Sequence, residues 1–439
     1  MTRRKLLQRA AYSAATVTAL SYSRVLGANE RINIALIGCG IRGRAVGSLM
    51  AQVPDVAYVA VCDIADYTIE NIKQSEFIQK DAQGYKDFRK ILDRKDIQVV
   101  HVATPDHWHA APTILACRAG KDVYVEKPLA HSIREGRMMV DAARKYNRIV
   151  QTGTQHRSAP HYKEIEELIQ NGQIGDVHYV RVWNYGGSAT QIASPDAEPP
   201  AGVDWDVYLG PAPKVPFNRQ RFQGTFRRFY DYAGGFITDF GAHRLDSVAQ
   251  IMHDDRPLSA FGVGGLYVRH GIEDTPDVIQ VTYEFKNWVL SYEGIQLNTF
   301  GTGPRIPNGR VPYSATGTYD RPHGEAFYGT KGTIFSDRVG YELFMGAGRG
   351  GGGTPKSVQG ADRTDLHTAN FIECVRSRKA PNAEVEIGHR SSIICHLGNI
   401  SYRIGGRKIR WDADKEQIID DPQASALLYR EPRKPWNLV

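Results

Sequence analysis

The chain has 439 residues, of which 41% are hydrophobic and 23% charged, which is typical of a globular protein with room for two domains. Its formal net charge is +7, but five basic side chains and no acidic ones fall within residues 1–28. The rest of the chain is close to neutral, so the composition gives no support for nucleic-acid binding.

Residues 1–28 are typical of an export signal. Residues 2–7, TRRKLL, resemble the twin-arginine pattern, and a weakly apolar stretch rich in Ala, Ser and Thr follows. That stretch is too short and too polar to span a membrane stably. We therefore expect the twin-arginine export machinery as a partner, a periplasmic or otherwise exported location, and no stable membrane insertion.

The five cysteines are odd in number and have no paired spacing, so we expect buried thiols rather than a disulfide framework.

The first motif with chemical meaning follows the apolar run 32–37. Gly38, Gly40 and Gly43 have the spacing of the dinucleotide fingerprint, in which the glycines allow a tight turn, approach of a pyrophosphate and close helix packing. Ile41 and Arg42 begin the expected helix, whose N-terminal amides would attract phosphates. These five residues are expected to bind the cofactor.

A second apolar run, 56–62, ends in Asp63, 20 residues after Gly43. A carboxylate at this place accepts hydrogen bonds from the ribose hydroxyls and repels a 2′-phosphate. No arginine follows Asp63 directly, so the expected cofactor is NAD rather than NADP.

The region around these motifs alternates between strand and helix patterns. Apolar strands are expected at 32–37, 56–62, 98–103, 123–126 and 149–152, with helices at 42–52, 68–80, 109–119 and 133–146. Strand–helix alternation with continuously apolar strands predicts an α/β fold, a Rossmann doubly wound parallel sheet over residues 29–154. Ligands of such sheets bind beyond the carboxyl ends of the strands.

The pattern changes after residue 155. Helices are expected at 161–170, 239–252, 371–376 and 393–400, strands at 177–185 and 327–335, a hairpin over 278–285 and 288–296, and a glycine-rich loop at 346–353. This predicts a substrate-binding α+β domain over 155–410 with an open, mainly antiparallel sheet, followed by a C-terminal arm, 411–439. The open sheet is a plausible surface for a homo-oligomer.

Polar residues follow the ends of the strands 98–103 and 123–126. Thr104 and Pro105 are expected to line the nicotinamide ribose, and Glu126 and Lys127, at the end of the neighbouring strand, are expected to contact the cofactor as well. His107 and His109 could be read as metal ligands, but their spacing at a helix start favours capping and packing beside the nicotinamide, so we expect no metal site.

Two further positions carry polar groups. Gln155 ends another strand and is expected to meet the cofactor. Asp239 and His243 are four residues apart on one expected helix, so their side chains share one face.

Together the glycine fingerprint, Glu126-Lys127-Pro128 and the spacing of Gly234, Gly235, Asp239 and His243 resemble the Gfo/Idh/MocA family of sugar and polyol oxidoreductases. The resemblance covers essentially the whole chain after residue 30. It implies an N-terminal Rossmann domain, a C-terminal α/β domain, and action on sugars, polyols or glycosides with NAD(P). It also implies that Lys127 is catalytic and that Asp239 and His243 form an acid–histidine pair.

Oxidation of an alcohol needs a base for the hydroxyl proton, and neutral histidine suits that role. A lysine can stabilise the developing alkoxide, and Asp239 could orient His243 or bind a hydroxyl. Which residue takes the proton stays open.

Aromatic and arginine side chains in the second domain could bind a sugar through stacking and forked hydrogen bonds. The candidates for substrate contact are Arg157, Tyr185, Trp205 and Arg228.

Export constrains the mechanism, because the periplasm holds no large free nicotinamide pool. We therefore expect NAD to be tightly retained and regenerated within the cycle. An oxidoreductase is the first interpretation. The alternative is a redox-neutral glycoside hydrolase that oxidises C3 transiently and eliminates the glycosidic group, and a nucleotide-bound scaffold without catalysis is a third class.

Overall fold

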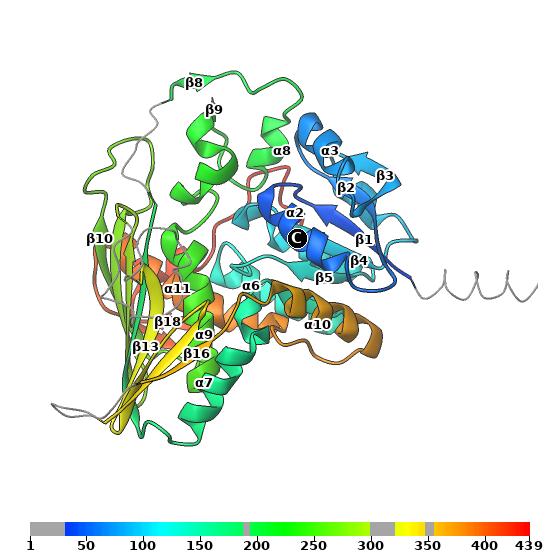
Figure 1. Ribbon diagram of the computed structural model, residues 1–439. Coiled ribbons are helices and arrows are strands. Elements are labelled where there is room, and N and C mark those ends of the chain that lie inside the picture. The colour runs from blue at the N-terminus through cyan, green and yellow to red at the C-terminus, as the bar shows by residue number, and fades with distance from the viewer. Residues whose placement is uncertain (1–30, 188–193, 299–320, 347–354) are drawn as a thin grey trace, which may run out of the picture.

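The computed structural model describes residues 31–187, 194–298, 321–346 and 355–439. An N-terminal α/β part and a larger part built on a second sheet lie against each other (Figure 1). The signal-like residues 1–28 and nearly all of the glycine-rich run 346–353 fall outside the described residues.

The N-terminal part contains a six-stranded parallel sheet of order β3-β2-β1-β4-β5-β6. Its strands are β1 (Ile32–Ile37), β2 (Val56–Cys62), β3 (Ile78–Tyr85), β4 (Val99–Val102), β5 (Asp122–Val125) and β6 (Val150–Thr152). The helices of this part are α2 (Ile41–Met50), α3 (Asp66–Lys73), α4 (Arg89–Leu92), α5 (Ala110–Arg118) and α6 (Ile133–Lys145). Strands β4 and β5 are buried along their whole length, as expected when both faces of a sheet are covered. The predicted doubly wound fold is confirmed.

Strand β3 corrects one prediction. The expected helix 68–80 ends at Lys73, and its last residues belong to β3 instead. Within the described part of the chain this strand pairs with β2 alone, at the edge of the sheet, and most of its side chains are exposed. An edge strand of this kind has no apolar run by which a sequence could reveal it.

The second sheet has ten strands in the order β16-β15-β14-β13-β7-β12-β11-β10-β17-β18. They are β7 (Val177–Tyr185), β10 (Ser259–Gly265), β11 (Val278–Glu284), β12 (Val289–Ile295), β13 (His323–Gly329), β14 (Gly332–Asp337), β15 (Gly340–Met345), β16 (Lys356–Gln359), β17 (Ile409–Asp412) and β18 (Gln417–Ile419). Among the described strands of this sheet, only β7 and β12 pair in parallel, so the predicted mainly antiparallel sheet is confirmed. The single strand expected at 327–335 is wrong, because β13 and β14 form a hairpin across it.

Helices α7 (Pro160–Gln170), α9 (Phe236–Met252) and α11 (Val385–Arg403) contribute buried side chains to the core of this sheet. Helix α10 (Thr364–Ser377) packs on the N-terminal part instead, since Phe371 and Ile372 share a hydrophobic core with residues of β1 and β2. All five cysteines are buried and free. Within the described residues, no helix has both the length and the apolar character needed to cross a membrane.

Between β7 and α9 the chain forms a third, smaller layer. It contains β8 (Asp196–Ala197), α8 (Trp205–Leu209), β9 (Phe217–Asn218) and two short 3₁₀ turns, Arg219–Arg221 and Gln223–Arg228. Aromatic side chains give this layer its own core, around Tyr208, Phe217 and Phe229. Residues 200–228 are called the cover segment below.

The C-terminal residues return to the N-terminal part after α12 (Pro422–Ser425). The ring of Trp436 packs edge-on against Trp108, with the centroids 5.5 Å apart. Arg433 donates to Asp206 at 2.9 Å and to the carbonyl of Ala212 at 3.1 Å. The C-terminal arm therefore contacts both the turn that precedes α5, through Trp108, and the cover segment.

Candidate functional site

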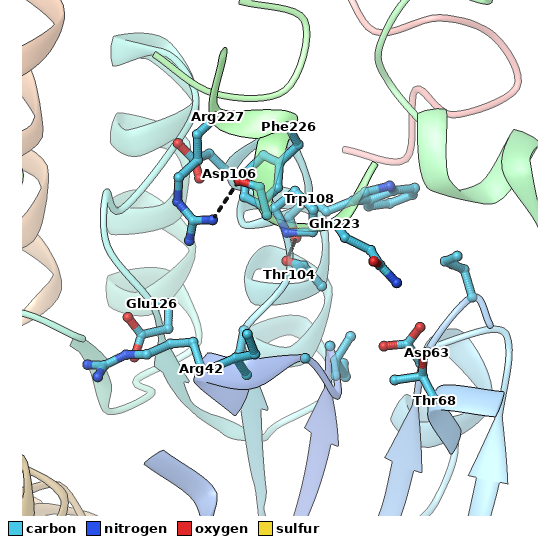
Figure 2. Close-up of a pocket in the computed structure, with 18 of the residues that line it drawn as sticks. Arg42, Asp63, Thr68, Thr104, Asp106, Trp108, Glu126, Gln223, Phe226 and Arg227 are labelled. Carbon is cyan, nitrogen blue, oxygen red and sulfur yellow. Dashed lines mark hydrogen bonds and ion pairs between the residues drawn. The ribbon is translucent and has the colours of Figure 1, made fainter. Parts of the chain in front are cut away.

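A cavity of about 660 Å³ lies at the carboxyl ends of the parallel strands, between the N-terminal part and the rest of the chain (Figure 2). Twelve residues singled out from the sequence line it: Gly38, Gly40, Ile41, Arg42, Asp63, Thr104, Pro105, Glu126, Lys127, Gln155, Asp239 and His243. The fold thus gathers the glycine loop and the three predicted catalytic residues around one space.

The glycine loop has the shape that a pyrophosphate requires. Gly38 has φ +91°, and a Cβ there would lie 2.5 Å from the carbonyl oxygen of Ala103. A Cβ on Gly43 would lie 2.2 Å from the Gly38 oxygen, whereas one on Gly40 would meet nothing within 4 Å. Gly38 and Gly43 therefore serve the turn and the helix packing, and Gly40 leaves room for a ligand against the backbone.

Two more observations fit a dinucleotide. Helix α2 begins at Ile41 without a side-chain cap on Gly40, which leaves its first amides available to phosphates. The Ile41 side chain is 91% exposed although it lines the cavity, and a bound nucleotide would cover it.

Asp63 stands at the end of β2. Its carboxylate accepts from the amide of Cys39 at 2.9 Å and from that of Ala65 at 3.2 Å. Burial raises the pKa of Asp63, while these backbone donors act in the opposite direction. The loop and the carboxylate are thus joined into one unit that presents oxygen acceptors to the cavity.

Lys127 and Asp239 lie at the centre of the end of the cavity opposite Asp63. The Lys127 ammonium donates to Asp239 Oδ1 at 2.6 Å and to the Asp239 carbonyl at 2.8 Å, and Arg227 Nε lies 3.1 Å from the same Oδ1. Burial alone would raise the pKa of Asp239, but Arg227 and Lys127 hold it well below its usual range. Asp239 therefore positions two cations, Lys127 and Arg227. The sequence had offered orientation of His243 as one role for this carboxylate.

His243 lies one turn further along α9 and is only 5% exposed. Burial, with Arg338 and Lys127 nearby, holds the pKa of its imidazole well below the usual range. Among the described residues, Nδ1 of His243 has no hydrogen-bond partner. The ring is therefore neutral near neutral pH and able to accept a proton.

Arg42 and Glu126 point toward each other across the cavity floor (Figure 2), with Nε and Oε1 2.8 Å apart. Arg42 also donates to Gln155 at 3.3 Å, and Gln155 donates to Asp362 at 3.1 Å. This chain of contacts ties the start of α2 to the ends of β5 and β6.

Asp106 is a site residue that the sequence did not single out. It follows Pro105, lines the cavity and is buried. Burial raises the pKa of Asp106 to about 7, and the negative charge of Asp239 also raises it. Lys127 and Arg227 lower the pKa but do not offset burial. The cavity thus contains a carboxyl that changes charge near neutrality.

Replacing this carboxyl should change the pH dependence of folding. The pKa of Asp106 is higher in the folded protein (about 7) than its ordinary value of 3.8, so the folded state binds the extra proton between these values. Raising the pH through this window therefore lowers the free energy of unfolding. At pH 8 the free energy of unfolding of Asp106→Asn is expected to exceed that of the parent by on the order of 1–4 kcal/mol. This difference between the two proteins should narrow toward pH 4. Chemical denaturation of the nucleotide-free protein at both pH values checks this, and a pH-independent gap contradicts it.

His107 and His109 are not among the residues that line the cavity, and their place beside the nicotinamide stays a prediction. His107 Nε2 lies 2.9 Å from the carbonyl of Tyr208. The two ring nitrogens of His109 lie 2.7 Å from the Pro128 carbonyl and 3.0 Å from the Thr104 carbonyl. Both histidines are buried and tie neighbouring backbone segments together.

The four predicted substrate residues are also placed elsewhere. Each already has a partner within the protein: Arg157 pairs with Asp246 at 2.9 Å, Tyr185 donates to Glu293 at 2.5 Å, Trp205 stacks on Tyr208, and Arg228 pairs with Glu273 at 2.6 Å. None of the four is among the cavity-lining residues. Phe226, Arg227 and Arg338 line it instead. Arg227 stands beside the predicted Arg228, and only the turn Gln223–Arg228 decides which of the two faces inward.

Comparison with known proteins places this geometry in context. Residues 32–154 match the Gfo/Idh/MocA model described as "Oxidoreductase family, NAD-binding Rossmann fold". Residues 162–261 and 355–438 match the "C-terminal alpha/beta domain" of the same family.

Individual relatives agree. A levoglucosan dehydrogenase of Pseudarthrobacter phenanthrenivorans is 31% identical over 62% of this chain and 69% of its own length. A myo-inositol 2-dehydrogenase of Thermotoga maritima is 23% identical over 70% and 76%. A glycosyl hydrolase family 109 protein of Saccharopolyspora erythraea is 33% identical, but over only 28% of each chain.

One solved structure, a levoglucosan dehydrogenase in complex with NADH and levoglucosan, has the same fold. It superposes with a TM-score of 0.64, covers 89% of this chain and all of its own, and is 19% identical.

Proposed function

Because the chain belongs to the Gfo/Idh/MocA family of oxidoreductases, we propose that it transfers hydride between NAD and a hydroxyl-bearing carbon of a sugar, polyol or glycoside. The observation that carries the proposal is that Lys127, Asp239 and His243 line the same cavity as the glycine loop and Asp63. The relatives that act on levoglucosan and myo-inositol support this substrate class.

The charge of each residue in the site suits it to a different role in the reaction. NAD, when bound by the glycine loop and Asp63, supplies the hydride acceptor. Lys127 donates a hydrogen bond to the substrate oxygen and stabilises the negative charge that develops there. His243, neutral and unpaired at Nδ1, accepts the hydroxyl proton. Asp239 fixes the Lys127 ammonium through two contacts at its carboxylate and carbonyl.

The proposal includes export and a retained cofactor. The twin-arginine pattern in residues 2–7 supports passage of a folded, cofactor-loaded protein to the periplasm. Protein isolated from that compartment and then denatured should release about one nicotinamide nucleotide per chain. Addition of the right sugar to the native protein should change the absorbance of the bound nicotinamide, which a catalytically dead scaffold would not show. Protein isolated without nucleotide contradicts retention.

The alternative is net hydrolysis of a glycoside after transient oxidation at C3. The short match to a glycosyl hydrolase family 109 protein favours keeping it. Oxidation at C3 acidifies the C2–H bond, the glycosidic group leaves by elimination, water adds, and the ketone is reduced again. Turnover in D₂O should place deuterium at C2 in this route and leave C2 unlabelled in simple oxidoreduction.

Asp63→Ser tests the cofactor assignment. Loss of the carboxylate removes the acceptors for the ribose hydroxyls and the repulsion of a 2′-phosphate. The affinity for NADH is expected to fall by about tenfold to a hundredfold, while the affinity for NADPH falls less or rises. Titration by nucleotide fluorescence measures both, and Glu70→Gln, an exposed acid on α3, is the control. An unchanged preference contradicts the role of Asp63.

A further inference from the structure

Part of the cavity wall opposite Asp63 comes from outside the Rossmann domain. Phe222, Gln223 and Gly224 of the cover segment line it, together with Tyr67 and Lys86 from the N-terminal part. The Gln223 side chain extends toward the side of the cavity that holds Asp63 and Thr68 (Figure 2). Since the carboxylate of Asp63 marks the adenosine ribose, the cover segment faces the adenosine half of a bound dinucleotide.

The cover segment is joined by backbone hydrogen bonds to the residues that directly follow Asp63. The amide of Asp204 donates to the Ile64 carbonyl at 2.9 Å, and the amide of Asp66 donates to the Gly202 carbonyl at 3.1 Å. Lys86 adds a bond to the same Gly202 carbonyl at 3.0 Å. The ribose-binding turn is therefore held by a segment more than 130 residues distant in the sequence.

A side-chain bond closes this wall of the cavity. The amide of Gln223 donates to the hydroxyl of Tyr67 at 3.0 Å, and both residues line the cavity. Gln223 has φ +52°, a left-handed conformation that costs a residue other than glycine on the order of 1 kcal/mol. Such strain persists where other contacts fix the residue, and here it aims the amide at Tyr67.

A second attachment lies at the end of β4. The indole of Trp108 donates to the carbonyls of Val207 and Tyr208, each at 3.0 Å. Gly210 has φ +47°, and a Cβ there would lie 2.1 Å from the Trp108 ring. The cover segment is thus fixed to the Rossmann domain after β2 and after β4, on both sides of the nucleotide cavity.

We propose that the cover segment is a nucleotide-binding element, closed over the adenosine half of NAD by the Gln223–Tyr67 bond, and that it slows cofactor release. This rests on the proposed function, which requires a retained cofactor. The segment supplies the Gln223 amide to the polar edges of the nucleotide and the Phe222 ring to its apolar surface, and α3 adds the Tyr67 phenol.

The test measures nucleotide release rather than turnover. Tyr67→Phe removes only the hydroxyl, and Gln223→Asn keeps a residue that tolerates positive φ but shortens the amide. Each is expected to speed NADH dissociation about threefold to tenfold, the value of one hydrogen bond, as followed by loss of NADH fluorescence on mixing with excess NAD. The double variant should release no faster than either single variant, because one bond is lost in all three. Arg219→Gln, exposed on the same segment, is the matched control.

Fragments of the cofactor separate this element from the rest of the site. Both variants should bind ADP-ribose more weakly and nicotinamide mononucleotide as the parent does. Unchanged NADH release in folded variants overturns the proposal and leaves the enzymatic function standing. Rapid NADH release by the parent protein contradicts retention in the proposed function, whereas the ratio of variant to parent rates still decides the role of the cover segment.

Discussion

Lys127→Met is expected to lower the rate of hydride transfer by about two to three orders of magnitude, while NADH affinity changes by no more than a few fold. The methionine keeps the length of the side chain but cannot donate to the substrate oxygen. Single-turnover absorbance of the bound nicotinamide separates this step from product release. Lys163→Met, exposed on α7, is the control for a lost surface charge.

Loss of this lysine also leaves the partly buried Asp239 carboxylate with Arg227 as its remaining ion-pair partner among the described residues. We therefore expect a lower melting temperature for Lys127→Met, and partial recovery when Asp239→Asn is added. Activity should not recover with stability, because the donor is still missing. A double variant that regains both would show that Lys127 serves the fold alone.

His243→Ala is expected to reduce hydride transfer by about a hundredfold to ten-thousandfold, the usual contribution of a general base. Because burial and neighbouring cations hold the pKa of His243 well below 6.5, protonation of His243 should cause no loss of activity as the pH falls through that value. Rates of the parent and variant between pH 5 and 8 check both points.

The two variants together identify the proton acceptor. If His243→Ala transfers hydride at nearly the parent rate while Lys127→Met does not, the lysine takes the proton. An acid limb near pH 6.5 that persists in Asp106→Asn, where the other group titrating near neutrality is removed, would contradict a histidine held neutral by its surroundings.

The sequence predicted those parts of the fold and site whose chemistry is local. The glycine loop and Asp63 depend on a strand, a turn and a helix that follow each other directly, and β1 and β2 have the predicted bounds. Lys127 and the Asp239–His243 spacing were found because each follows a strand end or lies within one helix. Strand β3 was not predicted, because an edge strand needs few apolar residues.

The substrate side could not be predicted in the same way. Arg227 and Arg228 are adjacent and chemically equal, and the turn that separates their directions is set by contacts with Asp239 and Glu273 from other elements. Trp205 and Tyr185 carry the aromatic faces that a sugar favours, but one stacks within the cover segment and the other bonds across the sheet. Composition identifies such side chains without telling which way they face.

The packing of Trp436 on Trp108 links residues separated by more than 300 positions of sequence. During synthesis, the glycine loop and β4 leave the ribosome long before Arg433 and Trp436 exist to brace the wall beside them. A growing chain can therefore form its parallel sheet early but must wait for these late residues before the cofactor chamber reaches its final shape, so loading is an event of the finished polypeptide.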